Sequence, residues 1–314
     1  MLATLGDEPL AAHPFARVQV ARLAEQELDF DLCSDLLARA LPEVPAGAPR
    51  REVMAEAIAV RAMVDPSDGI EREASEILDE CGSEEWRTRA RALTALGRVA
   101  AWEGDAASML RAEGRLGEAA ALCRLAGEVE WEARTLTGLG YRVSFARGDF
   151  GAAIRQMGDA LALLPAPGRE RAAVATFLAE AMAYVGRIDE AEATLGEAAA
   201  IGRRLGDHRV LAYAAWTGMT AASLRADEAA TLQRIRTVEL HPGGWYDHPT
   251  GIEFLADASL ALARIGAQDG AAEYAERATE RAIAAGHPEI GWLPAGAVAA
   301  RWGCLLYTSD AADE

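Results

Sequence analysis

The 314-residue sequence contains no lysine and no asparagine, so all 31 of its basic side chains are arginines. Without lysine the chain has no Walker A lysine, no Schiff-base lysine and no kinase-type phosphate-binding lysine. The HExxH, GxSxG and EF-hand patterns are missing as well. We therefore expect no catalytic residue, no cofactor and no metal site, and we expect that the protein is not an enzyme.

Two small groups of residues look like parts of functional motifs but have simpler interpretations. Gly138 and Gly140 lack the third glycine and the preceding strand of a dinucleotide fingerprint, so we interpret them as contacts between packed helices. Asp29, Asp31 and Asp35 surround a predicted turn. We interpret these carboxylates as N-cap and first-turn charges, which the helix dipole favours.

Aromatic residues are also few, at 6%, whereas 51% of the residues are hydrophobic and the formal net charge is -18. The commonest residues, Ala, Leu, Arg and Glu, favour helices, so we predict an all-α fold. The acidic charge argues against direct nucleic-acid binding. No apolar run approaches the roughly 20 residues that span a bilayer, and the N-terminus does not resemble a signal peptide. The sequence therefore predicts a cytoplasmic protein without membrane contact.

Cysteines are sparse and widely separated. Cys33, Cys81 and Cys123 form no CxxC motif, and the fourth, Cys304, lies in the terminal segment described below. This pattern indicates reduced thiols rather than a disulfide framework.

A small residue recurs after each predicted turn: Ala119, Ala153, Ala191, Ala229 and Ala271. Five residues before them are Gly114, Gly148, Gly186, Leu224 and Gly266. Seven residues after them are Ala126, Ala160, Ala198, Arg236 and Ala278. The glycine is expected to end one helix in the left-handed conformation. Alanines seven residues apart lie on one face of the next helix, where they allow two helices to pack closely.

This frame predicts helical hairpins near residues 13–41, 50–82, 129–166, 169–205, 208–240 and 251–286. The segment 84–128 is ambiguous, because Gly104 and Gly114 could each form its turn and it holds one long hairpin or three shorter helices. Residues 287–303 are predicted to form the first helix of a further pair. Since no hairpin can bury its apolar stripe alone, we predict a superhelical solenoid of about seven antiparallel helix pairs.

Two segments carry a family resemblance. Residues 148–154 (GDFGAAI) and 186–192 (GRIDEAE) resemble the turn and second-helix start of the tetratricopeptide repeat family, and Pro165 lies where that family often closes a repeat. The spacing here reaches 38 and 42 residues, which exceeds the family's period of about 34. Longer repeats of this kind, with the sequences 146–149 (ARGD) and 101–105 (AWEGD), resemble the repeat region of large LuxR-type ATP-dependent transcriptional regulators. The resemblance covers roughly residues 84–300.

The last eleven residues, 304–314 (CLLYTSDAADE), differ from the rest in composition and resemble a translated sequencing transposase adapter. We therefore expect three parts. These are an N-terminal segment, 1–12; a tetratricopeptide-like repeat domain, 13–303, irregular at 84–128 and truncated at its C-terminal end; and a non-native tail, 304–314.

The resemblance to the repeat family also implies which residues face the inner surface of the solenoid. They are the candidate binding residues Arg142, Phe145, Glu180, Tyr184 and Arg264, together with Ala183. Arginine, glutamate and aromatic side chains suit a peptide or a small polar ligand. The alternative is an ordinary solvated inner face.

The connection 241–249 (HPGGWYDHP) is the longest between predicted repeats. Trp245 and Tyr246 could contact a ligand, or they could fold back as an apolar plug in a structural loop. A third interpretation is a metal site, because its two histidines and one aspartate are possible zinc ligands.

Our leading hypothesis is a non-catalytic helical-repeat module for interaction or ligand sensing, as a fragment of a bacterial signal-responsive transcriptional regulator. Its expected partner is a protein or peptide, with a small-molecule effector as a further possibility. The alternative is a free-standing scaffold for protein–protein interaction.

Overall fold

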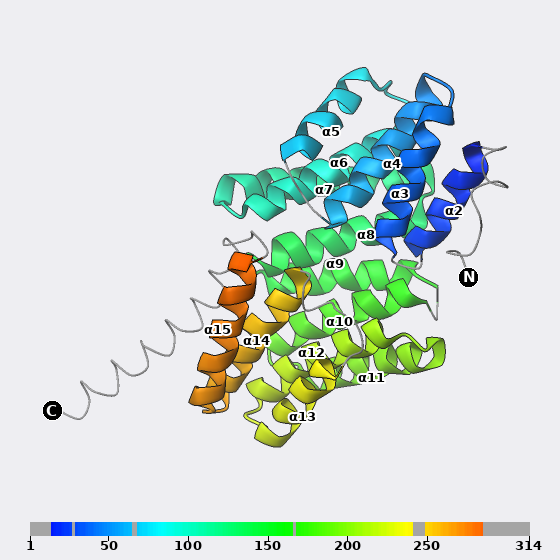
Figure 1. Cartoon of the computed structure of the whole chain (residues 1–314). Helices are drawn as coiled ribbons and strands as arrows, with labels where there is room; N and C mark the ends of the chain where they lie inside the picture. Colours follow the sequence, from blue (N-terminus) through cyan, green and yellow to red (C-terminus); the bar gives the residue numbers. More distant parts are fainter. Residues whose placement is uncertain (1–13, 27–28, 65–67, 166–167, 241–248, 285–314) are drawn as a thin grey trace. The chain divides into compact units, whose positions relative to one another are not determined.

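The computed structural model describes residues 14–26, 29–64, 68–165, 168–240 and 249–284. All regular structure in these ranges is helical, and it consists of consecutive antiparallel helix pairs (Figure 1). The pairs are α2 (Pro14–Gln26) with α3 (Phe30–Ala40), α4 (Ala48–Val64) with α5 (Asp68–Glu80), α6 (Trp86–Glu103) with α7 (Ala106–Ala126), α8 (Val129–Gly138) with α9 (Phe150–Leu163), α10 (Arg169–Tyr184) with α11 (Ile188–Leu205), α12 (His208–Leu224) with α13 (Glu228–Glu239), and α14 (Pro249–Arg264) with α15 (Gln268–Ala284). The predicted all-α class of about seven helix pairs is confirmed.

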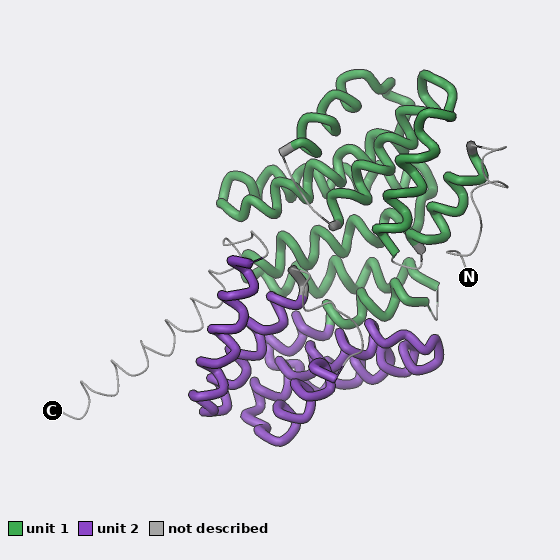
Figure 2. The backbone as a smooth tube through the Cα atoms, in the orientation of Figure 1, with its two compact units in different colours: residues 1–178 green, residues 179–314 purple. Residues whose placement is uncertain are grey.

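The chain forms two compact units, residues 1–178 and 179–314, and their boundary falls inside α10 (Figure 2). We call them unit 1 and unit 2 and describe each separately. Among the described residues, the buried charged side chains lie on the first helices of the pairs. The second helices bury both small residues and larger ones such as Leu37, Ile77 and Ile235.

The turns within the later pairs explain the repeat frame. Gly148, Gly186 and Gly266 have positive φ, as the frame predicts. In the fourth turn, however, the positive-φ residue is Ala226 and not the predicted Leu224. A pattern based on glycine does not recognise an alanine at the turn, so the predicted frame is displaced by two residues there.

The small residues that follow these turns show the same pattern. Ala153, Ala191 and Ala271 are buried in the second helices, as expected. Ala229 is exposed, and Thr231 takes its place as the buried small residue. Seven residues after Thr231, the buried residue is Val238 and not the predicted Arg236.

The ambiguous segment 84–128 is one long hairpin, with its turn at Gly104. The side chain of Asp105 then caps α7 by accepting hydrogen bonds from the backbone N–H groups of Ala107 and Ser108. Gly114 lies inside α7, so it is not a turn residue. The Asp29 side chain likewise caps α3, as predicted.

Close helix contacts explain several of the glycines. A Cβ atom on Gly97 would lie 2.6 Å from the Leu116 side chain, and one on Gly140 would lie 2.7 Å from Met157. Gly140 belongs to a π-helical segment, Leu139–Phe145, that extends α8. The interpretation of this glycine as a helix contact is thus supported by its geometry.

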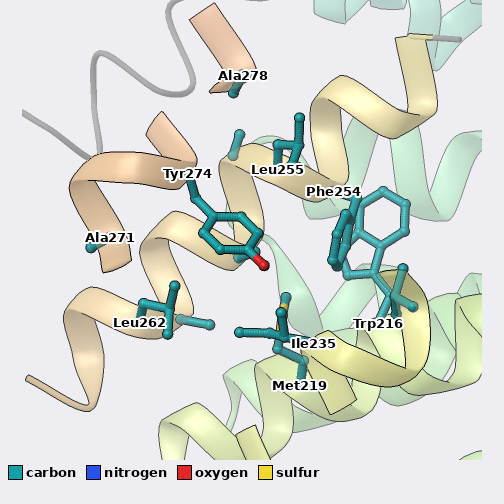
Figure 3. Packing of buried hydrophobic residues seen from close by; sticks show 13 residues of the cluster. Trp216, Met219, Ile235, Phe254, Leu255, Leu262, Ala271, Tyr274 and Ala278 are labelled. Carbon is teal, nitrogen blue, oxygen red and sulfur yellow. The ribbon is translucent and has the colours of Figure 1, made fainter. Parts of the chain in front are cut away.

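The core of unit 2 is rich in large side chains (Figure 3). Trp216 from α12 packs against Phe254 from α14, and Tyr274 projects from α15 into the same cluster. Phe254 and Met219 are fully buried there. This packing fixes the positions of α12 and α14 relative to each other.

Several expectations concern other properties of the chain. The predicted helix at 287–303, the tail 304–314 and the N-terminal segment 1–12 lie outside the described residues. None of the helices in the described part is long and apolar enough to cross a bilayer. In the same ranges no group of three or more His, Cys, Asp or Glu side chains could hold a metal ion. Cys33, Cys81 and Cys123 are free thiols.

Candidate binding site on the first helices

Three successive first helices of unit 2 bring together polar and aromatic side chains. We call Tyr184 of α10, Trp216 of α12, and Asp257 and Arg264 of α14 the unit 2 cluster. The Trp216 indole Nε1 donates a hydrogen bond to Asp257 Oδ2 at 2.9 Å. The Arg264 guanidinium carbon lies 5.6 Å from the centre of the Tyr184 ring, within the range of a cation–π contact. Each helix therefore contributes at least one member.

Asp257 has an unusual electrostatic environment. Its burial raises its pKa to about 7, and the negative charge of Glu253 acts in the same direction. The hydrogen bond from Trp216 and the charge of Arg264 oppose this rise without cancelling it. Asp257 therefore exchanges a proton near neutral pH, unlike an ordinary aspartic acid.

Tyr184 is partly exposed and packs beside charged groups. Burial raises the pKa of its hydroxyl, Arg264 opposes this effect through a hydrogen bond and its charge, and Glu180 and Asp257 add to the rise. The hydroxyl stays protonated at neutral pH and can both donate and accept hydrogen bonds.

Two further aromatic rings pack against Trp216, the hydrogen-bond partner of Asp257. Tyr213 stacks on Trp216 with ring centres 5.8 Å apart, and Trp216 meets Phe254 edge to face at 5.7 Å. Tyr213 keeps partial exposure, whereas Trp216 is only 9% exposed. Trp216 thus contributes a buried ring to this group, and Tyr213 contributes one that is partly accessible to solvent.

The structure divides the five predicted inner-face residues between the units. Glu180, Tyr184 and Arg264 belong to one electrostatic group in unit 2, although Glu180 is only 9% exposed. Arg142 and Phe145 lie in unit 1. The additional predicted inner-face residue, Ala183, is buried and belongs to the core cluster of its helix pair.

Arg142 and Phe145 belong to an aromatic group on the π-helical segment of unit 1. Arg142 is exposed, and its guanidinium lies 5.6 Å from the Tyr141 ring. Phe145 stacks on Tyr141 at 5.3 Å and meets Phe150 edge to face. Tyr141 in turn stacks on Phe177 of α10 at 4.3 Å. The predicted loop residues Trp245 and Tyr246 lie outside the described residues.

Two members of the unit 2 cluster were absent from the predicted set. Trp216 packs in the core of unit 2, and its indole N–H also orients Asp257. Asp257 precedes Arg264 by seven residues, a spacing that places both on one helix face. This spacing is the sequence signal that could have identified Asp257.

The first helices of unit 1 carry a different arrangement, dominated by ion pairs. Arg134 of α8 lies between two glutamates, with Nη1 2.8 Å from Glu25 and Nε 2.5 Å from Glu170. Arg91 pairs with Glu128 at 2.5 Å. We call these five residues the unit 1 ion network. Burial lowers the pKa of Arg134, but Glu25 and Glu170 outweigh burial and raise it, so Arg134 is permanently charged.

Comparisons with known proteins define the fold. No family model and no curated protein sequence matches the chain. Among solved structures, a Rap protein in complex with competence and sporulation factor superposes with a TM-score of 0.67 at 14% identity, over 88% of this chain and 76% of that one. Aspartyl phosphate phosphatase F from Bacillus subtilis superposes with a TM-score of 0.55 at 15% identity, over 88% and 73% of the two chains. The chain thus has a tetratricopeptide-like helical-repeat fold.

Proposed function

We propose that the protein is a non-catalytic interaction module and that the unit 2 cluster binds an extended segment of a peptide or protein partner. The observation that carries this proposal is the convergence of Tyr184, Trp216, Asp257 and Arg264 from three first helices. Tyrosine, tryptophan and arginine are the residues most enriched among those that dominate binding energy at interfaces. Asp257 and Arg264 would give the site one acceptor and one donor with fixed orientation.

The structural neighbours support a binding role for this fold. The Rap protein was determined in complex with competence and sporulation factor, so a helical-repeat chain of this fold can hold a partner. The name of the second neighbour refers to a phosphatase, and that activity belongs to that protein. In the unit 2 cluster, Arg264 contacts Tyr184 and Asp257 accepts a hydrogen bond from Trp216. These contacts orient the converging side chains, which suits recognition of a partner.

For the biological context, we propose the sensing arm of a bacterial transcriptional regulator. The basis is the similarity of the repeat region to that of LuxR-type regulators. Binding would then shift the protein between two conformations, which requires that the partner has different affinities for them. A free-standing scaffold is the alternative. Sequencing the gene on both sides separates the two, because an upstream GxxxxGK[ST] and a downstream helix-turn-helix are expected only for the regulator.

Selection from a random linear-peptide library tests the proposed site directly. Peptides that bind the wild-type protein are expected to bind Tyr184→Ala and Arg264→Ala at least roughly tenfold more weakly, since interface anchors commonly contribute 2 kcal/mol or more. Isothermal titration calorimetry measures the affinities. The peptide affinity of Arg142→Ala, measured in the same way, tests whether the predicted inner-face residue Arg142 of unit 1 contributes to binding.

Arg277→Ala is the matched control. Arg277 also lies over a tyrosine ring in unit 2, 4.6 Å from the centre of Tyr274, but it belongs to a second helix. Its removal should leave peptide affinity unchanged. Equal losses in Arg264→Ala and Arg277→Ala, or unchanged binding in Tyr184→Ala, would show that the binding surface lies elsewhere.

A further inference from the structure

A pocket of about 370 Å³ lies in unit 1, where the start of α6 meets the start of α4 and the end of α7. Helix α6 packs against both of these helices (Figure 1). The polar part of the lining includes Glu52 of α4 and residues 84–88, and Leu125 and Ala126 of α7 contribute apolar surface. Small-molecule sites commonly have volumes of roughly 300–1,000 Å³, so this pocket can hold a small metabolite.

The start of α6 offers hydrogen-bonding groups that the protein does not use. Glu85 occupies the N-cap position, but its side chain makes no hydrogen bond to the first N–H groups of the helix. Its carboxylate instead accepts hydrogen bonds from Arg51 at 2.6 Å and from the backbone N–H of Gly82 at 3.0 Å. Thr88 lines the pocket and is only 3% exposed, yet its hydroxyl has no partner among the described residues. Because buried polar groups are nearly always hydrogen-bonded and an uncapped helix N-terminus favours negative charge, this side of the pocket suits an anionic group.

Carboxylates line the same pocket and are incompletely neutralised. Glu84 is exposed and forms no ion pair within the described part of the chain. Glu52 shares the guanidinium of Arg22 with Glu56, since Arg22 Nη2 lies 3.4 Å from Glu52 and 2.8 Å from Glu56. Arg87 in the lining is already paired with a glutamate outside the pocket. The pocket can therefore attract a positive group as well as a negative one.

Two large side chains supply the apolar surface of the pocket. Leu125 is 63% exposed, although it is a leucine on a helix that packs against α6. Trp86 is partly buried and makes no hydrogen bond or ring contact within the described residues. A hydrocarbon group that covers these side chains removes apolar area from water, which favours its binding.

We propose that this pocket binds a free α-amino acid with an apolar side chain. The hydroxyl of Thr88 and the first N–H groups of α6 bind the carboxylate of the ligand, and Glu84 and Glu52 bind its ammonium group. The side chain of the ligand covers Trp86 and Leu125. A zwitterion satisfies both kinds of charge, whereas a simple anion meets repulsion from the glutamates and a simple cation leaves the start of α6 without an acceptor. The site lies in unit 1 and does not depend on the peptide binding proposed for the unit 2 cluster.

Titration calorimetry of the whole chain with L-leucine, L-methionine and L-phenylalanine tests the site. Saturable binding of at least one of them is expected, and the one that binds most tightly identifies the preferred side chain. Its N-acetyl derivative lacks the positive charge and its amide lacks the negative charge. Each derivative should bind at least roughly tenfold more weakly, because a charge-assisted hydrogen bond is lost. The proposal is overturned if none of the three amino acids binds, or if either derivative binds as tightly as the amino acid.

Two substitutions locate the binding in this pocket. Thr88→Val and Glu84→Gln remove no hydrogen bond or ion pair of the described protein, so the Tm without ligand should change little, while the affinity for the amino acid should fall roughly tenfold in each. Thr88→Ser retains the hydroxyl and should keep the affinity. Glu80→Gln is the matched control, because Glu80 is an exposed glutamate four residues before Glu84 that does not line the pocket. Wild-type affinity in Thr88→Val or in Glu84→Gln would overturn the proposal, as would an equal loss in Thr88→Ser or in Glu80→Gln.

Discussion

The two units use the same helix positions for different purposes. In unit 1, the first helices carry arginines that are neutralised by glutamates, as in the Glu25–Arg134–Glu170 group. In unit 2, the first helices carry aromatic rings around one acid, Asp257, whose hydrogen-bond donor is the neutral indole of Trp216. The buried charge of Arg134 in unit 1 is thus neutralised by glutamates, whereas the charge of Asp257 in unit 2 changes with protonation near neutral pH.

This difference agrees with our proposal that the unit 2 cluster binds a partner whereas the unit 1 ion network has a structural role. Removing one member of a buried ion pair leaves the other charge buried without compensation. In our proposal the unit 2 cluster, with Tyr184 partly exposed and a titratable acid at Asp257, accepts a partner without such a loss.

The largest effect is expected from breaking the unit 1 ion network. Arg134→Ala leaves Glu25 and Glu170 close to each other, with exposed side-chain fractions of 4% and 13%. Removing one partner of a buried ion pair costs about 3–5 kcal/mol. We expect a loss of this size in the free energy of unfolding, measured by urea denaturation.

Arg147→Ala is the matched change at the surface of unit 1. Arg147 pairs with Glu113 at 2.6 Å, but the two side chains are 44% and 51% exposed. Exposed pairs contribute at most about 1 kcal/mol. If Arg134→Ala destabilises the protein no more than Arg147→Ala, the contrast between a structural network and a surface pair is wrong.

A smaller effect is expected from Asp257 in unit 2, and it depends on pH. Its pKa of about 7 lies above the unfolded value of about 3.9, so folding favours the protonated form. The stabilising contribution is complete below about pH 4 and is lost as the pH rises through 7. Asp257→Asn cannot ionise. It should therefore be more stable than the wild type at pH 8, by about 1–3 kcal/mol, with no such gain at pH 4.

Urea denaturation of both proteins between pH 4 and pH 8 measures this difference. Asp189→Asn is a suitable control, because Asp189 is highly exposed at the start of α11 and pairs with Arg225 at the surface. Its stability relative to the wild type should change little over the same range. A constant difference between Asp257→Asn and the wild type at all pH values would contradict the raised pKa.

Most of the fold follows from local sequence signals. Glycine at a helix end, an aspartate cap and small residues seven apart are read directly from the chain, and they give the helix pairs to within a few residues. The prediction failed where other residues took these roles, as with Ala226 and Thr231. Gly114 misled the search because a glycine inside a helix looks the same in sequence as a glycine at a turn.

The candidate site was less predictable. The resemblance to a repeat family predicted the inner-face residues of the first helices, and the structure places two of them, Tyr184 and Arg264, beside each other. It did not show that Glu180 is largely buried or that Trp216 orients Asp257, since both depend on packing between separate helices. The paired glutamates of Arg134 come from sequence distances of 109 and 36 residues, which no local pattern reveals.

The smallest effect on stability is expected at the turns within the helix pairs, where the two units use different residues in the left-handed conformation. Unit 1 uses Gly148 at the turn between α8 and α9, with φ of 75°, and unit 2 uses Ala226 at the equivalent turn, with φ of 56°. The left-handed conformation costs a residue with a Cβ atom about 1–2 kcal/mol, while glycine loses about 0.4–1 kcal/mol more backbone entropy on folding. Ala226→Gly should therefore stabilise the protein by about 0.5–1 kcal/mol, and Gly148→Ala should destabilise it by a similar amount. A Cβ atom on Gly148 would meet no other atom within 4 Å, so both substitutions report on the backbone conformation alone. Urea denaturation measures the two changes in the free energy of unfolding. Changes of opposite sign would support this explanation, and changes of the same sign would contradict it.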